Sequence, residues 1–155
     1  MWTVELDGKE STLALGHGLG EAVSGPARVS LVGDLGAGKT TFAQGVGFGL
    51  GLGSAVVSPT FILMAEHHDG RYPMLHGDAY QLKPSEAEAI GMDETIETWP
   101  GLVLLEWGDL MPEVFEGPHI QVTLVHSGHG RVATITAQGP CHVDLLNAWK
   151  AAFNA

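Results

Sequence analysis

One stretch near the start of the chain constrains its fold more than any other. Residues Gly33 to Thr40 read GDLGAGKT and fit the pattern G-x-x-x-x-G-K-[ST]. A short apolar run, Ala27 to Gly33, precedes the turn, and a segment with helical periodicity, Lys39 to Leu50, follows it. In a strand–turn–helix of this kind, backbone N–H groups at the helix N-terminus surround phosphate oxygens. The chain is therefore predicted to have an α/β fold built around a phosphate-binding loop (P-loop).

Each residue type in this loop has a chemical role. Gly36 and Gly38 permit backbone conformations and a close approach to phosphate that a side chain would block. Lys39 can reach the β- and γ-phosphates of ATP, and the Thr40 hydroxyl can bind magnesium. The predicted nucleotide-binding residues are Gly33, Asp34, Leu35, Gly36, Ala37, Gly38, Lys39, Thr40 and Thr41.

A magnesium site of this kind needs an acid at the end of an apolar strand. Glu106 occupies that position in the run Gly101 to Asp109, GLVLLEWGD, and it is the predicted magnesium-side and catalytic acid. An ordinary glutamate at a strand end is the alternative. Trp107, next to it, is a candidate to flank the nucleotide.

Asp78 is a second candidate acid. In LHGDAY, His76 and Tyr80 share its strand face if the strand persists there. Asp78 could bind magnesium through water or orient an attacking water, so it is predicted as a catalytic or metal-associated residue. A turn aspartate after Gly77 is the alternative.

A switch-like segment is predicted at SPTF, Ser58 to Phe61. A hydroxyl on a segment beyond the first helix can sense the γ-phosphate, which makes Ser58 and Thr60 candidates. A Ser-Pro turn before a strand explains the same residues without any switch.

The rest of the chain predicts two hairpins and three more helices. The strand pairs are 60–68 with 71–80, joined across Asp69-Gly70, and 119–127 with 131–139. The helices are 13–24, capped by Ser11 or Thr12, then 83–91, and finally 142–153. Glycines after Gln44 predict that helix 39–50 frays at its end. Together these elements indicate one P-loop NTPase-like domain, 1–155, with a mixed central sheet between helices in three layers.

Composition limits the partners. Seven Lys and Arg against 18 Asp and Glu give a net charge of −11, so direct tight binding to nucleic acid is not expected. Cys141 is the only cysteine, which excludes an intramolecular disulfide and a zinc cage. No apolar run approaches the roughly 20 residues that a bilayer needs, and a cytoplasmic protein without membrane contact is expected.

The motifs GDLGAGKTTF, SPTF, HGDAY and LLEWGD, in this order, resemble those of the bacterial TsaE family, formerly YjeE. The resemblance covers nearly the whole chain. It implies a small P-loop ATPase required for N6-threonylcarbamoyladenosine, the modification next to the anticodon of tRNAs that read codons beginning with A. It also implies a TsaB–TsaD heterodimer as partner, with weak ATP hydrolysis in its absence. In this family hydrolysis resets that complex, and TsaE transfers no carbamoyl group.

The same resemblance assigns residues. Lys39 would hold phosphates, Thr40 and Glu106 magnesium, and Asp78 would be a catalytic or magnesium-associated acid; Arg131 is a weaker match for a nucleotide contact. The chain departs from the family pattern at three positions outside the loop and the two acids. Gln81 stands where arginine is common, Gly77 where phenylalanine is frequent, and Gly108 where proline is common.

Other functions stay open. A small-molecule kinase needs cations on a lid, and this chain has three arginines, Arg28, Arg71 and Arg131. A nucleotide-sensing switch with negligible hydrolysis fits Asp78 and Glu106 equally well. An ATPase stimulated by nucleic acid is disfavoured by the charge.

Overall fold

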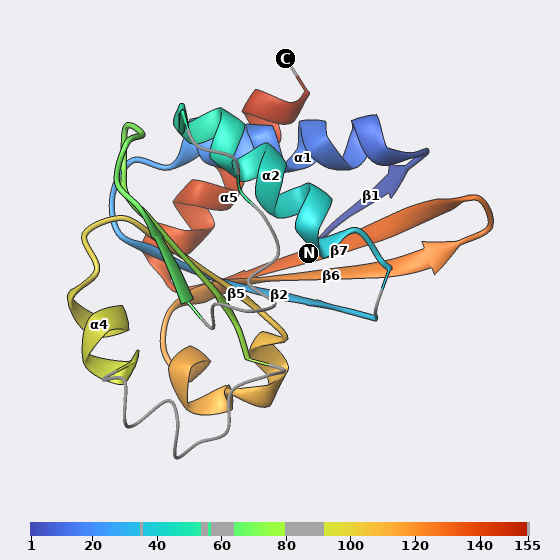
Figure 1. The fold of residues 1–155 in the computed structure, drawn as a ribbon. Coiled ribbons are helices and arrows are strands. Elements are labelled where there is room, and N and C mark those ends of the chain that lie inside the picture. Colours follow the sequence, from blue (N-terminus) through green and yellow to red (C-terminus); the bar gives the residue numbers. More distant parts are fainter. Residues whose placement is uncertain (35, 54–55, 57–63, 80–91, 155) are drawn as a thin grey trace.

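A seven-stranded mixed sheet forms the centre of the protein (Figure 1). The computed structural model describes residues 1–34, 36–53, 56, 64–79 and 92–154. The strands are β1 (Trp2–Leu6), β2 (Ala27–Gly33), β3 (Met64–His67), β4 (Met74–Asp78), β5 (Leu102–Glu106), β6 (His119–Ser127) and β7 (Gly130–Gln138), in the spatial order β1-β7-β6-β2-β5-β4-β3. Strands β6, β2, β5 and β4 run parallel, whereas β7 and β3 pair antiparallel with their neighbours β6 and β4.

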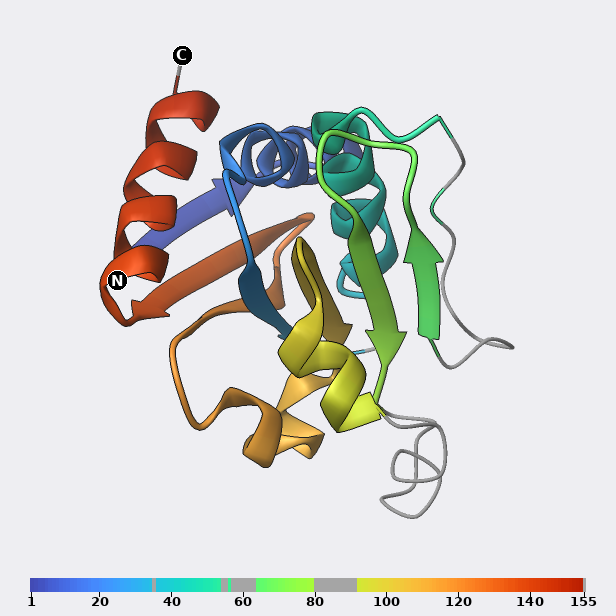
Figure 2. The same cartoon turned by 90° about the vertical axis from the view of Figure 1, so that its left-hand side faces the viewer.

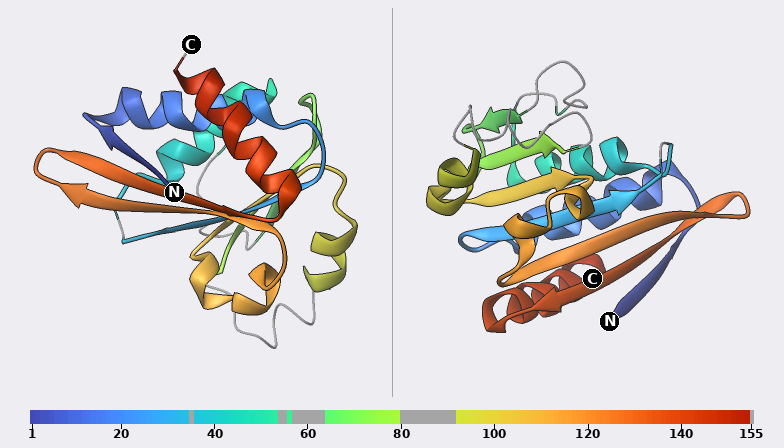
Figure 3. Two further views of the ribbon diagram at one scale, coloured as in Figure 1. Left: turned by 180° about the vertical axis from the view of Figure 1, so that it is seen from behind. Right: turned by 90° about the horizontal axis from the view of Figure 1, so that it is seen from below.

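Helices cover both faces of this sheet. The helical elements are α1 (Lys9–Ala22), α2 (Lys39–Leu50), α4 (Met92–Thr98), α5 (Pro140–Phe153) and two 3-10 turns, η1 (Gly108–Leu110) and η2 (Pro112–Phe115). Helices α1, α2 and α5 lie on one face, and the short α4 lies with the 3-10 turns on the other (Figures 2 and 3). The predicted three-layer, P-loop NTPase-like α/β fold is confirmed.

Two apolar cores lie on the two faces of the sheet. The larger one joins the strands to the three long helices, and Trp149 of α5 and Phe42 of α2 are fully buried in it. The smaller one lies under α4 and the 3-10 turns and contains Trp99 and Phe115. All five residues of β4 and of β5 are buried, as is typical of parallel strands covered on both faces.

Strand β2 and helix α2 have the bounds that the sequence predicts, and both hairpins form. In the first hairpin His67 pairs with Met74, and in the second Ser127 pairs with Gly130. The last helix forms as well and begins two residues earlier than predicted. The predicted helix 83–91 lies outside the described residues. Strand β1 and helix α4 had no sequence prediction.

The prediction for the start of the first helix is wrong. Helix α1 begins at Lys9 after Gly8, which makes no side-chain cap. Thr12 lies inside the helix, where its hydroxyl donates to the Gly8 carbonyl at 3.3 Å. A threonine inside a helix can bond back to the preceding turn in this way, so its presence alone does not locate a helix start.

The glycines near the end of α2, from which the sequence predicts fraying, pack against α1. Helix α2 continues to Leu50 because Gly45 and Gly49 lie directly against the backbone of α1, where Gly16 and Gly20 lie against α2 in return. A Cβ atom at any of these four positions would collide with a backbone carbonyl of the other helix. The glycines therefore permit a close helix crossing, and the packing gained there offsets their poor helix propensity.

No helix among the described residues is long and apolar enough to cross a membrane.

Candidate nucleotide site

The P-loop connects the end of β2 to the start of α2. Gly36 and Gly38 have φ values of 78° and 102°, in the left-handed region that favours glycine. The Phe42 N–H donates to the Gly38 carbonyl at 2.9 Å, so the helical hydrogen bonds begin at the loop itself. The N–H groups of the first helical turn precede this bond and have no partner within the helix, which is the arrangement that binds phosphate. Leu35 lies outside the described residues.

Lys39 is held inside the loop. Its Nζ donates to the carbonyl oxygens of Gly33 and Asp34, the latter at 2.9 Å, and lies 4.3 Å from the ring centroid of Trp107. Burial lowers the pKa of Lys39, while the nearby carboxylates of Glu106 and then Asp78 oppose this shift. The ammonium is thus surrounded by acceptors that a phosphate can replace.

Trp107 reaches Lys39 through an unusual backbone turn. Its φ of 60° is the one positive value at a non-glycine position within the described residues. The turn follows β5 directly, and the Trp107 N–H donates to the Leu31 carbonyl of β2 at 2.8 Å. A left-handed bulky residue costs energy, of order 1–3 kcal/mol, and such strain concentrates at functional sites.

The two predicted acids lie side by side. Asp78 ends β4, Glu106 ends β5, and the two residues are register partners in the parallel pairing of these strands. Both carboxylates are largely buried, with 7% and 3% of the residue exposed. Leu31, near the end of β2, pairs with Glu106 on its other side. Ends of neighbouring parallel strands meet at one edge of a sheet, so the P-loop and both acids share that edge.

His76 joins this pair. Its Nε2 lies 2.6 Å from Oε2 of Glu106, and the histidine is fully buried. The other ring nitrogen, Nδ1, is buried and has no hydrogen-bond partner among the residues that the structure describes. Sequence reasoning placed His76 on the strand face of Asp78 and assigned it no role. The signal was its spacing of two residues from Asp78, but the partner on β5 could not be read from that spacing.

Arg131 lies against the outside of the loop. Its Nη2 donates to the Gly36 carbonyl at 3.0 Å, and its Nη1 donates to the Gly130 carbonyl at 2.9 Å. A cavity of about 310 Å³ lies between Arg131, the P-loop residues Gly36 and Gly38, and Thr41. Space for a ligand therefore adjoins the loop where β7 passes it. Ser58, Thr60 and Gln81 lie outside the described residues.

The side chains at this edge fit a magnesium–nucleotide complex. The Thr40 hydroxyl and the carboxylates of Asp78 and Glu106 are oxygen ligands, which Mg²⁺ prefers. The part of the chain that the structure describes contains no cluster of three or more His, Cys, Asp or Glu able to hold a metal alone. Mg²⁺ is commonly bound by one or two carboxylates together with substrate phosphates.

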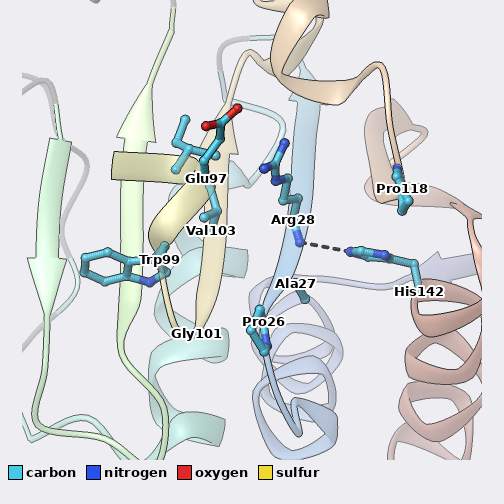
Figure 4. A pocket seen from close by; sticks show the side chains of 10 residues that line it. Pro26, Ala27, Arg28, Glu97, Trp99, Gly101, Val103, Pro118 and His142 are labelled. Atoms are coloured by element: carbon cyan, nitrogen blue, oxygen red, sulfur yellow. Dashed lines mark hydrogen bonds between the residues drawn. The ribbon is translucent and has the colours of Figure 1, made fainter. Parts of the chain in front are cut away.

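A second cavity, also of about 310 Å³, lies at the opposite end of the sheet (Figure 4). Its walls include Arg28, Trp99 and His142, near the starts of β2 and β5. Nε2 of His142 accepts the backbone N–H of Arg28 at 3.0 Å, and burial lowers the pKa of this histidine. This cavity has no glycine-rich loop and no paired carboxylates, so it is separate from the candidate nucleotide site.

Comparisons with known proteins agree on one family. Residues 6–133 match the family model described as "Threonylcarbamoyl adenosine biosynthesis protein TsaE". A protein of that name from Nostoc sp. is 44% identical over 150 residues, which cover 94% of this chain and 92% of the relative. The relative from Bacillus subtilis is 40% identical over 72% of this chain and 70% of its own length.

A solved structure supports the same relationship. The crystal structure of YdiB from Bacillus subtilis superposes with a TM-score of 0.81 and 29% sequence identity. The match covers 97% of this chain and 94% of that one, so the similarity extends over the whole fold.

Proposed function

This chain belongs to the TsaE family of tRNA threonylcarbamoyladenosine biosynthesis, and on that premise we propose that it is a magnesium-dependent ATPase. The proposal includes a TsaB–TsaD complex as the partner that stimulates hydrolysis and is reset by it. One observation supports ATP turnover most directly: Lys39 and the register-paired carboxylates of Asp78 and Glu106 lie at a single sheet edge. The same edge carries the P-loop, so phosphate binding and acid chemistry would occur together.

The proposed mechanism starts with an exchange of partners at Lys39. Bound phosphate replaces the carbonyls of Gly33 and Asp34 around the ammonium, while N–H groups at the start of α2 hold the phosphate oxygens. Magnesium, when bound by Thr40 and Glu106, would neutralise negative charge on the phosphates. Asp78 accepts a hydrogen bond from the attacking water and orients it toward the γ-phosphate.

The arginines argue against the kinase alternative. Arg28 donates to the Val114 carbonyl, Arg71 to three carbonyls at the end of α1, and Arg131 to the carbonyls of Gly36 and Gly130. All three guanidinium groups of the chain are therefore engaged by its own backbone. A kinase lid needs cations that close over the transferring phosphoryl group, and these arginines lack that freedom.

The net charge of −11 supports a role through protein partners. A chain this acidic repels bare tRNA, so tRNA contact is assigned to the partner complex. The same charge favours association with a basic partner surface.

Phosphate release from ATP tests the proposal. The purified protein is assayed alone and with the TsaB–TsaD pair, with Mg²⁺ and with EDTA. Slow release that the pair stimulates strongly, and that Glu106→Ala abolishes, is the expected result. Tight ATP binding without stimulated release would replace the ATPase by a nucleotide-sensing switch. Phosphorylation of a small molecule in place of phosphate release would revive the kinase alternative.

A further inference from the structure

We propose that His76 is a positioning residue for Glu106, holding its carboxylate in the orientation that binds magnesium. The inference rests on the proposed function and goes beyond it, because the ATPase proposal assigns His76 no part. The contact that carries it is the 2.6 Å approach between Nε2 of His76 and Oε2 of Glu106. His76 is 0% and Glu106 4% exposed at this contact, whereas the contacts of His17 with Glu21 and of His68 with Glu66 lie at the surface.

The geometry assigns the proton to Nε2. A carboxylate oxygen at hydrogen-bond distance accepts, so Nε2 must donate. Nδ1 is buried and has no partner within the described part of the chain, so a second N–H there would be a donor without an acceptor among those residues. Such a donor would lose its hydrogen bond to water without gaining another, which favours the arrangement in which Nε2 is the donor. The imidazole therefore directs its Nε2–H at Glu106.

The position of His76 in the sheet explains why this contact is specific. His76 pairs in register with Leu104, and Asp78 pairs with Glu106. His76 and Glu106 thus lie diagonally across two parallel strands on the same face, at a span that long side chains can bridge. From there the imidazole reaches Oε2, and Asp78 pairs in register with Glu106 at the end of β4.

A fixed carboxylate matters here because the last torsion of glutamate is otherwise broad. Glu106 also lies next to a second carboxylate, and like charges push such groups apart. The hydrogen bond from His76 opposes that displacement and occupies Oε2, which leaves the other oxygen for the metal. Groups that orient metal ligands in this way commonly change metal affinity by about 10–100-fold when they are removed.

The dependence of nucleotide affinity on Mg²⁺ tests this role without using turnover. The Kd for ADP is measured with Mg²⁺ and with EDTA for the wild type, His76→Phe and His76→Gln. His76→Phe keeps a ring of similar size and removes the donor, whereas His76→Gln keeps an N–H at a similar reach. The control His142→Phe removes another buried imidazole, at the opposite end of the sheet.

We expect His76→Phe to reduce the Mg²⁺ enhancement of ADP affinity by about tenfold. The Kd in EDTA stays within about twofold, and His76→Gln restores most of the enhancement. His142→Phe leaves both values unchanged. In a Glu106→Gln background, where the metal ligand is already lost, adding His76→Phe has no further effect on the enhancement, which is the coupling that a double-mutant cycle detects.

Two results would overturn the inference. One is an undiminished Mg²⁺ enhancement in folded His76→Phe. The other is equal loss of ADP affinity with and without Mg²⁺ in both His76 variants, which would make His76 a structural residue of the core. A wild-type protein whose ADP affinity does not respond to Mg²⁺ overturns the proposed magnesium chemistry itself, so the two failures are distinguishable. Unfolding curves for each variant establish that the folded protein is being measured.

Discussion

Replacing Gly45 with alanine should destabilise the protein, although helix propensity alone predicts the opposite. Gly45 lies within α2, and alanine in place of glycine inside a helix gains about 1 kcal/mol. In the structure, however, a Cβ at this position would collide with the carbonyl oxygen of Leu13 and lie 3.1 Å from the backbone nitrogen of His17. Both atoms belong to the backbone of α1, so no side-chain rotation can relieve the collision.

The magnitude follows from these two opposing effects. Overpacking that forces backbone shifts costs typically 1–3 kcal/mol, and a collision between two helix backbones belongs at the upper end, about 3 kcal/mol. Subtracting the propensity gain of about 1 kcal/mol leaves a net loss of about 2 kcal/mol in the free energy of unfolding. With a urea dependence of about 2 kcal/mol per molar, the midpoint of unfolding falls by about 1 M.

Urea unfolding followed by circular dichroism measures this shift, and Gly18→Ala is the matched control. Gly18 also lies inside a helix, but a Cβ there would meet only side-chain atoms of Trp149 and Phe153, at 3.2 Å or more. We expect Gly18→Ala to change the midpoint by less than half as much as Gly45→Ala, which corresponds to about 1 kcal/mol or less. An unchanged or raised midpoint for Gly45→Ala would refute the close crossing of α1 and α2.

Three further predictions concern the site and its surroundings. Lys39→Ala should abolish ATP binding, measured by calorimetry, because its ammonium is the buried cation of the P-loop. If the variant still binds ATP tightly, the assignment of this loop as the phosphate-binding loop is wrong. Asp78→Ala should leave ATP affinity largely intact and lower partner-stimulated phosphate release by about 10²-fold or more, and unchanged release would reduce Asp78 to a structural residue. His142 should make the protein less stable as the pH falls below 6.5: burial lowers its pKa in the folded state, so the unfolded chain binds the extra proton first. Comparing urea midpoints at pH 7.5 and 5.5 should show a smaller decrease in His142→Gln, and an equal decrease in both proteins would contradict this origin.

Local patterns in the sequence determined the elements next to the P-loop. The pattern lies within a span of about 24 residues: seven consecutive residues of β2, a glycine-rich turn and one apolar face of α2. The structure has this strand and this helix with the bounds that the pattern predicts. The two hairpins could also be predicted from the sequence, because Asp69-Gly70 and the glycines near His129 mark turns between strands that are adjacent along the chain. In such cases the residues that interact are neighbours in sequence, so periodicity and turn chemistry are sufficient.

The start of α1 shows where local patterns fail. Thr12 is a good helix cap by residue type, yet the helix extends back to Lys9. Gly45 is a poor helix residue by propensity, yet it lies where two helix backbones meet. At Gly45 the contact with α1 outweighs a helix preference of about 1 kcal/mol, as tertiary packing commonly does. At Thr12 the hydroxyl bonds back to the Gly8 carbonyl from inside the helix, so its residue type alone did not locate the helix start.

The sequence by itself determined that this chain has a P-loop on an α/β fold, and it identified Asp78 and Glu106 as candidate acids. Only the tertiary structure decided that these acids are register partners, that His76 bonds to Glu106 across 30 residues of sequence, and that Trp107 covers Lys39. The physical reason is that spacing along a strand specifies the face on which a side chain lies and carries no information about the neighbouring strand. That neighbour is chosen by the order and register of the whole sheet, which depend on packing against α1, α2 and α5.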